Sequence, residues 1–315
     1  MCTAIAYNGK GFYFGRNLDY EHGFGEQIVI TPRGYSFNFR RRPPVNTHYS
    51  IIGIASVRQG FPLYYDAANE KGLCIAGLNF VGNASYGTFK SGADNIAHFE
   101  IIPYILSQCA TVKETHALLQ KVNITDEPFS NDTPPASLHW IIADKNGCIV
   151  LECMKDGLHI YENPIGVLTN NPPFPFQLFA LNNFLGLSVK NPAESNWGGA
   201  ALSPYSRGMG AFGLPGDLSS QSRFIRAAFV KSFSQSGDAS GDTEQFFHIL
   251  DSVKQVRGCT VTDDGKYEYT LYSSCFNEDK KTYCVTTYDN REIRSYYMYD
   301  GAVSPGRLTV YPLHD

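Results

Sequence analysis

The chain has few of the features that mark membrane proteins, metalloproteins and nucleic-acid-binding proteins. No apolar run approaches the roughly 20 residues that a membrane-spanning helix needs, so we expect no helical membrane span. Eight histidines form no His-x-x-x-His pair and eight cysteines form no Cys-x-x-Cys pair, so we expect neither a metal nor another cofactor. The net charge is −4, from 26 basic and 30 acidic residues, and this balance argues against a nucleic-acid partner.

Signals for serine hydrolases, phosphate binding and export are also missing. The sequence has no Gly-x-Ser-x-Gly elbow and no glycine-rich phosphate loop. Because the N-terminus lacks a charged segment followed by an apolar secretory core, we expect a cytoplasmic protein whose cysteines stay mostly reduced. No linker divides the chain, so residues 1–315 are expected to form one domain, with 43% hydrophobic residues for its core.

The most informative residue that is present is the cysteine at position 2. Initiator methionine is normally removed before a small residue, so we expect the mature chain to begin with Cys2. One residue then holds a thiol nucleophile and an α-amine base, and the ordinary pKa of an α-amine, about 7.7–8.0, leaves a useful fraction neutral at pH 7. An N-terminal threonine works in the same way. The alternative is a buried cysteine that packs as a small hydrophobe.

A turn signal places two charged side chains beside this terminus. Asn8 and Gly9 separate two apolar runs, which predicts a hairpin of residues 2–7 with residues 11–17. The hairpin would bring Arg16 and Asp19 back to the start of the chain. There a guanidinium favours the thiolate and a carboxylate can hold the ammonium group, so both would activate the nucleophile.

Strand patterns dominate the rest of the chain, and helical periodicity is confined to a few segments. The turn at 144–147 joins two predicted strands directly, which indicates antiparallel pairing. Antiparallel strands with segregated helices predict an α+β fold. The predicted strands are 2–7, 11–17, 27–31, 138–144, 147–153, 157–162, 267–273, 282–288 and 292–299, and the predicted helices are 97–108, 111–121, 175–184, 222–232 and 243–253.

Six separated motifs, in order along most of the chain, resemble the choloylglycine hydrolase family. They are Met-Cys-Thr at 1–3, Phe-Gly-Arg-Asn-Leu-Asp at 14–19, Asn-Glu-Lys-Gly-Leu at 69–73, Ala-Gly-Leu-Asn-Phe at 76–80, Leu-Thr-Asn-Asn-Pro at 168–172, and Leu-Pro-Gly-Asp with Ser-Arg-Phe at 214–224. That family belongs to the N-terminal-nucleophile hydrolases and contains bile salt hydrolases and penicillin V acylases. The resemblance implies two antiparallel sheets packed face to face between helix layers, a four-layer αββα sandwich. It also implies a homotetramer.

The resemblance implies a role for each of six residues. Cys2 attacks an amide carbonyl to give a thioester, with Arg16 against the thiol and Asp19 anchoring the α-amine. Two asparagines contribute to the oxyanion hole and a second arginine supports the site electrostatically. The expected catalytic set is Cys2, Arg16, Asp19, Asn79, Asn170 and Arg223. Asn171, the neighbour of Asn170, stays open as an alternative.

Substrate choice depends on one position in the family comparison. The residue after Ala-Gly-Leu is typically Asn in bile salt hydrolases and Tyr in penicillin acylases, so Asn79 favours bile acids conjugated to glycine or taurine. A rigid steroid needs a wide apolar pocket, although each residue matched to it could equally be ordinary core. The positions that match pocket residues of the family are Leu18, Tyr65, Phe129 and Leu138.

Three other functions compete with this interpretation. A penicillin V acylase or acyl-homoserine-lactone acylase would use the same catalytic residues. A non-catalytic steroid or lipid carrier would keep the pocket and lose the chemistry, but the intact catalytic set argues against it. A Cys-His protease would need a histidine near a motif, and only His139 offers one; a hydrogen-bonded histidine within a sheet is the simpler interpretation.

Overall fold

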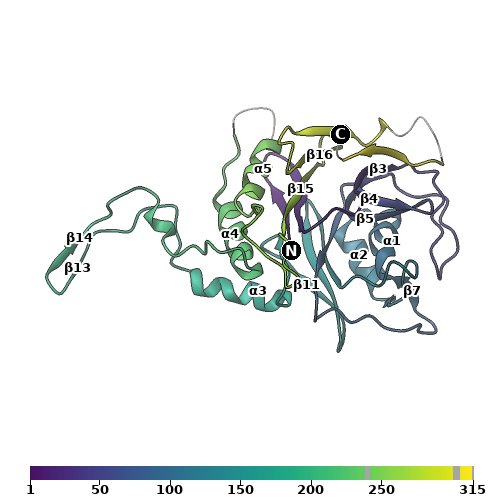
Figure 1. Cartoon of the computed structure of the whole chain (residues 1–315), viewed down its shortest axis with the longest axis horizontal. Helices are drawn as coiled ribbons and strands as arrows, with labels where there is room; N and C mark the ends of the chain where they lie inside the picture. Colours follow the sequence, from purple (N-terminus) through teal and green to yellow (C-terminus); the bar gives the residue numbers. More distant parts are fainter. Residues whose placement is uncertain (238–241, 301–305, 314–315) are drawn as a thin grey trace.

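Two large antiparallel sheets form the centre of the molecule (Figure 1). The computed structural model describes residues 1–237, 242–300 and 306–313. In spatial order, the six-stranded sheet contains β12 (Val167–Leu168), β1 (Cys2–Asn8), β2 (Phe12–Tyr20), β15 (Tyr269–Asn277), β16 (Thr282–Thr287) and β17 (Arg294–Tyr297). The eight-stranded sheet contains β11 (Gly157–Glu162), β10 (Gly147–Met154), β9 (Leu138–Asp144), β6 (Cys74–Asn79), β5 (Phe61–Asn69), β4 (Ile51–Arg58), β3 (Gln27–Thr31) and β18 (Thr309–Pro312).

Helices cover the outer face of each sheet. The helices α1 (Ile101–Gln108) and α2 (Val112–Leu119) pack on the eight-stranded sheet, and α4 (Ser220–Phe233) and α5 (Thr243–Asp251) pack on the six-stranded sheet (Figure 1). A fifth helix, α3 (Phe174–Ala180), contacts α4. The expected four-layer αββα arrangement is therefore confirmed.

Burial on both faces explains why the strands are so apolar. Ile141 and Ala143 of β9 belong to the core between the two sheets, whereas Trp140 and Ile142 belong to the core beneath α1 and α2. Successive side chains of a strand point to opposite faces, so a strand covered on both sides needs apolar residues at nearly every position. The eight-stranded sheet thus supplies residues to two separate cores.

The predicted elements differ from the observed ones mainly in the centre of the eight-stranded sheet. Strands β4, β5 and β6 were not among the predicted strands, because buried strands lack the alternation that marks half-exposed ones. The predicted helix at 97–108 is a short 3-10 helix, His98–Glu100, followed by α1 from Ile101, and it starts one residue late because Ala97 pairs in β7 (Asp94–Ala97) with β8 (Val122–Thr125). No helix in the described ranges is long and apolar enough to cross a membrane.

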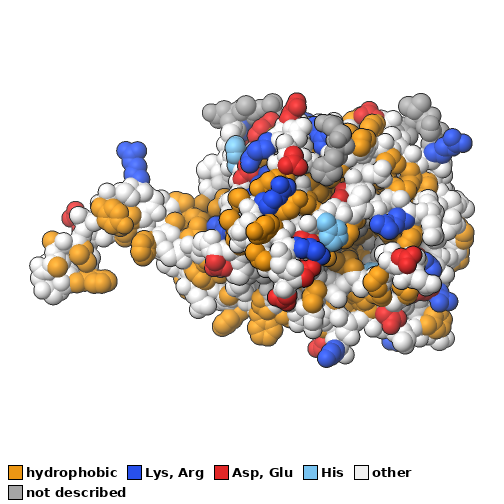
Figure 2. Space-filling view, viewed as in Figure 1, with side chains coloured by type: hydrophobic (Ala, Val, Ile, Leu, Met, Phe, Trp, Pro, Cys, Tyr) orange, Lys and Arg blue, Asp and Glu red, His pale blue; other side chains and the backbone are white. Residues whose placement is uncertain are grey.

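An arm projects from the body between α3 and α4. Its tip is a small hairpin of β13 (Ser195–Trp197) and β14 (Ala200–Leu202), which Figure 1 shows far from both sheets. Figure 2 shows hydrophobic side chains along this arm and at its base. The exposed ones are Phe176, Phe179, Leu185, Val189, Trp197, Leu202, Tyr205 and Phe212.

Candidate active site

The register of the β1–β2 hairpin divides the predicted residues between two faces of one sheet. Cys2 lies opposite Leu18 and Ala4 lies opposite Arg16, so these four side chains share a face. That face is directed at the eight-stranded sheet. The next residue along each strand points the other way, which directs Asp19 toward α4 and α5. The predicted hairpin is therefore confirmed, and its two charged residues act on opposite sides of the backbone.

On the face between the sheets, Arg16 is only 1% exposed. Its Nη1 donates to the carbonyl oxygens of Gly77 at 2.5 Å and Tyr65 at 3.2 Å. Its Nε and Nη2 have no hydrogen-bond partner within the described parts of the chain. Burial acts to lower the pKa of Arg16, but the negative charges of Cys2, Tyr272, Asp66 and Asp19 outweigh it and raise the pKa above its ordinary value.

A buried carboxylate, Asp66 on β5, lies close to Arg16. Its oxygens accept hydrogen bonds from Tyr272 at 2.8 Å, from Ser274 at 2.9 Å and from Tyr283. The Ser274 hydroxyl also accepts the backbone N–H of Arg16 at 3.1 Å. Burial raises the pKa of Asp66, while Arg16 and the three hydroxyls oppose that rise. Next to Arg16, a network of polar side chains thus joins the two sheets.

On the helix-facing side, Arg223 of α4 is fully buried and uses all of its nitrogens. Nη1 donates to the carbonyl oxygen of Cys2 and to Thr3 Oγ1, the latter at 2.7 Å. Nη2 donates to Asn170 Oδ1 at 2.7 Å, and Nε donates to the carbonyl oxygen of Leu218 at 3.0 Å. Burial lowers the pKa of Arg223. Arg223 therefore ties α4, β1 and the Asn170 loop together.

The first residue, Met1, is held at the end of the hairpin. Its ammonium group donates to the carbonyl oxygen of Asp19 at 2.7 Å and forms an ion pair with Glu268. Its own carbonyl oxygen accepts the Asp19 N–H at 2.9 Å. Burial lowers the pKa of this amine. The amine that precedes Cys2 therefore has both a hydrogen-bond acceptor and an ion-pair partner.

The Asp19 carboxylate is held by neighbours other than Cys2. It accepts hydrogen bonds from Thr270 at 2.6 Å and Gln255 at 3.2 Å, and Arg223 Nη1 lies 3.9 Å from Oδ2. The Cys2 nitrogen instead donates to Asn170 Oδ1 at 2.8 Å. With Met1 attached, the structure thus gives the Cys2 nitrogen a different partner from the one that the resemblance implies.

The two neighbouring asparagines, Asn170 and Asn171, have different surroundings in the structure. Asn170 is buried, and its Nδ2 donates to the carbonyl oxygen of Asn79 at 2.8 Å. Asn171 is exposed and donates to the carbonyl oxygen of Val81 at 2.8 Å. Asn170 therefore connects Cys2, Asn79 and Arg223, and Asn171 lies outside that group.

Two of the four expected pocket residues, Leu18 and Tyr65, lie beside Cys2 and Arg16, and a third, Leu138, lies next to Asn79 but packs with the core beneath α1 and α2. Leu18 faces Cys2 across the hairpin, Tyr65 offers its carbonyl oxygen to Arg16, and Leu138 pairs with Asn79 in the sheet register. Phe129 packs elsewhere: its ring centroid lies 5.2 Å from that of Phe99 and 6.3 Å from that of Phe61.

Sequence motifs did not identify several residues that hold the site together. Thr270 and Gln255 orient Asp19, and Gln177 donates to the carbonyl oxygens of Asn170 and Pro172. These are isolated polar residues of unremarkable type, and only their burial marks them as important. Buried polar side chains in a native protein are nearly always hydrogen-bonded, so burial was the missing signal.

His139, the histidine of the protease alternative, takes no part in a cysteine–histidine pair. Its Nδ1 meets Glu152 Oε1 at 2.9 Å and its Nε2 meets the carbonyl oxygen of Thr169 at 2.9 Å. With both nitrogens bonded, the ring has no free position to serve as the base for Cys2. Among the described residues, no three His, Cys, Asp or Glu side chains gather as metal ligands.

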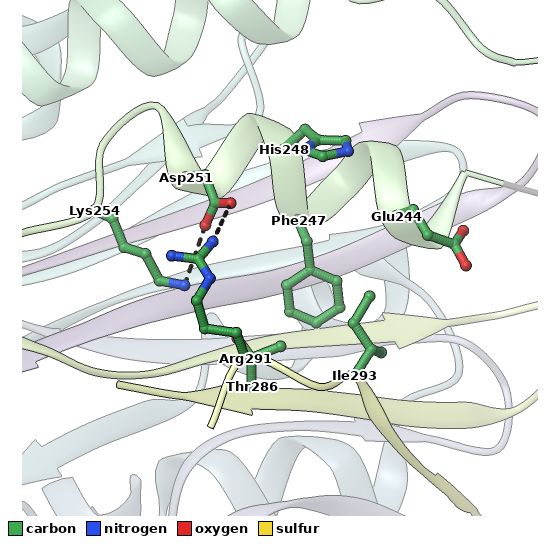
Figure 3. A pocket seen from close by; sticks show the side chains of 8 residues that line it. All are labelled: Glu244, Phe247, His248, Asp251, Lys254, Thr286, Arg291 and Ile293. Carbon is green, nitrogen blue, oxygen red and sulfur yellow. Dashed lines mark hydrogen bonds and ion pairs between the residues drawn. The ribbon is translucent and has the colours of Figure 1, made fainter. Parts of the chain in front are cut away.

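A separate pocket lies between α5 and β16 (Figure 3). Asp251 lies at one end, 2.9 Å from Arg291 and 3.1 Å from Lys254. The pocket is lined by Glu244, Phe247, His248, Asp251, Lys254, Thr286, Arg291 and Ile293. It therefore shares no residue with the group around Cys2.

Comparison with known proteins bears directly on this geometry. The sequence pattern of the family described as "Linear amide C-N hydrolases, choloylglycine hydrolase family" matches residues 2–305. The chain belongs to the choloylglycine hydrolase family. It is accordingly a hydrolase that acts on linear amide C–N bonds.

Similar proteins agree with the family in both sequence and fold. A bile salt hydrolase/transferase of Lactiplantibacillus plantarum is 51% identical over 314 residues, covering 99% of this chain and 97% of the relative. A solved variant of conjugated bile acid hydrolase from Clostridium perfringens superposes with a TM-score of 0.94 at 34% identity, covering 100% of this chain and 97% of that one. Penicillin V acylase from Agrobacterium tumefaciens shares the fold, with a TM-score of 0.78, 20% identity, and 98% and 90% coverage.

Proposed function

We propose that this choloylglycine hydrolase cleaves the amide bond of bile acids conjugated to glycine or taurine. The observation that carries the proposal is the 51% identity, over nearly the whole chain, to a protein named as a bile salt hydrolase/transferase. Asn79, the residue typical of bile salt hydrolases at its position, adds support from the sequence. The arrangement of Cys2, Arg16, Asn170 and Arg223 is compatible with this chemistry.

The proposed reaction begins after Met1 has been removed. The Cys2 thiol passes its proton to the new α-amine, and its sulfur bonds to the amide carbonyl carbon, whose oxygen becomes an anion. The tetrahedral intermediate then collapses: the C–N bond breaks, the proton moves to the departing amine nitrogen, and a thioester remains. Water, deprotonated by the same α-amine, adds to the thioester and releases the bile acid and the free thiol.

Each of the other five residues has a proposed part in these steps. Arg16 favours the thiolate, and its two unpartnered nitrogens support that assignment. Asp19 stabilises the ammonium form of the α-amine from the helix-facing side. Asn79 and Asn170 donate to the oxyanion, and Arg223 holds Asn170 and the Cys2 carbonyl in place.

The steroid is proposed to bind against Leu18, Tyr65 and Leu138. Leu18 and Tyr65 lie beside the reacting group, and Leu138 pairs with Asn79 in the sheet register. Partly buried Tyr65 extends the apolar surface toward Phe24, with ring centroids 6.1 Å apart. Phe129, whose neighbours are Phe61 and Phe99, would contribute only if the pocket reached that second aromatic group.

One comparison of substrates tests the function. Release of glycine and taurine from conjugated bile salts is measured beside penicillin V hydrolysis on the same protein. Fast bile salt cleavage with weak penicillin turnover supports the proposal, and the reverse would assign a penicillin acylase with the same machinery. Cys2→Ala is expected to abolish both activities. An unchanged cellular function in Cys2→Ala would instead favour the non-catalytic carrier.

The need for a free α-amine has its own test. One preparation is released from a fusion so that Cys2 is the first residue, and a second retains Met1, with each N-terminus verified by mass spectrometry. Only the first is expected to turn over, because an acylated nitrogen cannot act as the base. Equal rates from both preparations would rule out the proposed mechanism.

Acyl transfer is a second candidate activity. The name of the Lactiplantibacillus plantarum relative includes "transferase", and a thioester can be attacked by an amine in place of water. The bond changes are the same, with the amine nitrogen replacing the water oxygen. Formation of a new conjugate from a bile salt and a free amino acid, absent with Cys2→Ala, would demonstrate it.

We also propose that the chain forms a homotetramer in the cytoplasm. The exposed apolar side chains of the arm, such as Trp197 and Tyr205, favour burial against another subunit. All eight cysteines, each within the described ranges, are free thiols, in keeping with a reducing compartment. Light scattering should give four times the mass of one chain, and Trp197→Asp should lower it. Cell fractionation tests the location.

A further inference from the structure

A buried histidine outside the proposed catalytic set touches both segments that carry the proposed oxyanion donors. His139 on β9 is fully buried. Its Nε2 bonds to the carbonyl oxygen of Thr169, the residue directly before Asn170. Its ring also stacks on Phe80, the residue directly after Asn79, with centroids 4.2 Å apart and planes inclined by 8°. One side chain therefore contacts both neighbours of the Asn79–Asn170 pair.

The chemistry of the partners fixes how this ring is oriented. A carbonyl oxygen can only accept a hydrogen bond, so His139 Nε2 must carry a hydrogen and donate it to Thr169. The other nitrogen, Nδ1, meets Glu152 Oε1, an oxygen that also accepts the N–H of Phe174 at 3.0 Å. Glu152 thus links β10 and the start of α3 to the imidazole and prevents the ring from flipping.

The Asn170 loop needs such support because its geometry is demanding. The Asn170 side chain accepts from the Cys2 nitrogen and from Arg223, and donates to the Asn79 carbonyl oxygen at 2.8 Å. Gln177 holds this loop by donating to the carbonyl oxygen of Asn170. His139 holds the peptide before Asn170 from the eight-stranded sheet, where Asn79 itself is located.

We infer that His139, oriented by Glu152, is a positioning residue that holds the Asn79 and Asn170 segments at the spacing which oxyanion stabilisation requires. The inference deepens the proposed function, on which it rests. Displacing a donor by about 1 Å can cost roughly a hundredfold in rate, so a residue that never touches substrate can act through this spacing. His139 need not change its protonation state for this role.

Two substitutions test the hydrogen bonds of the two ring nitrogens one at a time. His139→Gln places an amide nitrogen near the position of Nε2 and can keep the bond to Thr169. His139→Asn places one near Nδ1, keeps the link to Glu152 and loses Thr169. A matched control is His159→Asn, because His159 Nε2 meets the carboxylate of Asp156 at 2.9 Å on the surface.

Steady-state kinetics and thiol alkylation together distinguish a positioning role from a purely structural one, because a purely structural role would change both measurements in parallel. For His139→Asn we expect kcat to fall about tenfold to a hundredfold, with KM and the rate of Cys2 alkylation by iodoacetamide unchanged. Alkylation needs no oxyanion donor, so it reports only on the thiol. His139→Gln should stay within about threefold of wild type, and His159→Asn should equal it. Unchanged kcat in His139→Asn, or a parallel fall in kcat and alkylation, would overturn the inference.

A crystal structure of His139→Asn tests the inference without any substrate. We expect the distance between Asn170 Nδ2 and the Asn79 carbonyl oxygen to exceed hydrogen-bond range, and to stay near 2.8 Å in His139→Gln. An unchanged distance in His139→Asn would refute the positioning role. This measurement needs no turnover, so it tests the inference even if the proposed function is wrong. Failure of the proposed function would instead appear as a wild-type protein that does not cleave bile salts.

Discussion

Two arginines are buried on opposite faces of the β1–β2 hairpin, and they are bonded very differently. Arg223 uses every nitrogen, whereas Arg16 uses Nη1 and leaves Nε and Nη2 without partners among the described residues. Burial lowers the pKa of Arg223, while negative neighbours raise that of Arg16. An arginine with every nitrogen bonded to the protein holds a structure together. One with donors to spare beside a thiol remains available to a developing negative charge.

The largest expected effect is on stability. Arg223→Met removes the donors for Cys2, Thr3 and Asn170 and breaks the ion pair with Asp19. Breaking a buried charge pair typically costs about 3–5 kcal/mol, and we expect a loss of that size in the free energy of unfolding. Urea denaturation measures it. Arg223→Lys, which keeps the charge but not the forked donors, should recover only part of the loss.

A similarly large effect is expected on catalysis at Asn170. Asn170→Ala removes one proposed oxyanion donor and should lower kcat by about 10²–10³-fold. Asn171→Ala is the matched control, since that side chain is exposed and its change should cost no more than about 0.5 kcal/mol in stability. Steady-state kinetics on a conjugated bile salt compares them. Equal losses in the two variants would contradict the assignment to Asn170.

Arg16→Met should separate reactivity from stability. Only two carbonyl oxygens lose a donor, so the free energy of unfolding should fall by about 1–3 kcal/mol, less than for Arg223→Met. Thiolate formation loses its nearby cation, and alkylation of Cys2 at pH 7 should slow about tenfold or more. Alkylation at the wild-type rate would show that Arg16, like Arg223, is structural.

The smallest effect is expected at Asp66. Asp66→Asn removes a negative charge beside Arg16 that offsets the guanidinium charge, so Arg16 should favour the thiolate more strongly and the pH profile of Cys2 alkylation should move to lower pH by roughly one unit or less. The charged and titratable groups around Arg16 are Cys2, Asp19, Asp66 and Tyr272, and Tyr283 also bonds to Asp66. Ser274→Ala keeps the charge and should not cause this shift to lower pH. An unmoved profile in Asp66→Asn would mean that Asp66 is already neutral.

The sequence by itself was sufficient to predict the hairpin beside Cys2 and, through its motifs, the family and the fold class. The position of Cys2, the turn at Asn8 and Gly9, and the spacing to Arg16 and Asp19 are local features, so they predicted a hairpin that the structure confirms. The motifs predicted the family and its αββα layers, which the structure and the comparisons confirm. The roles of the six catalytic residues remain predictions.

Only the tertiary structure decided which residues meet across long separations. Asn170 rather than Asn171 lies beside Cys2, Phe129 joins a different aromatic group, and His139 holds the loop instead of acting on the thiol. Arg16 and Asp19 fall on opposite faces because side chains alternate along β2. Motifs mark residue types, whereas hydrogen bonds between distant segments depend on how the two sheets and their helices pack, and no local pattern carries that information.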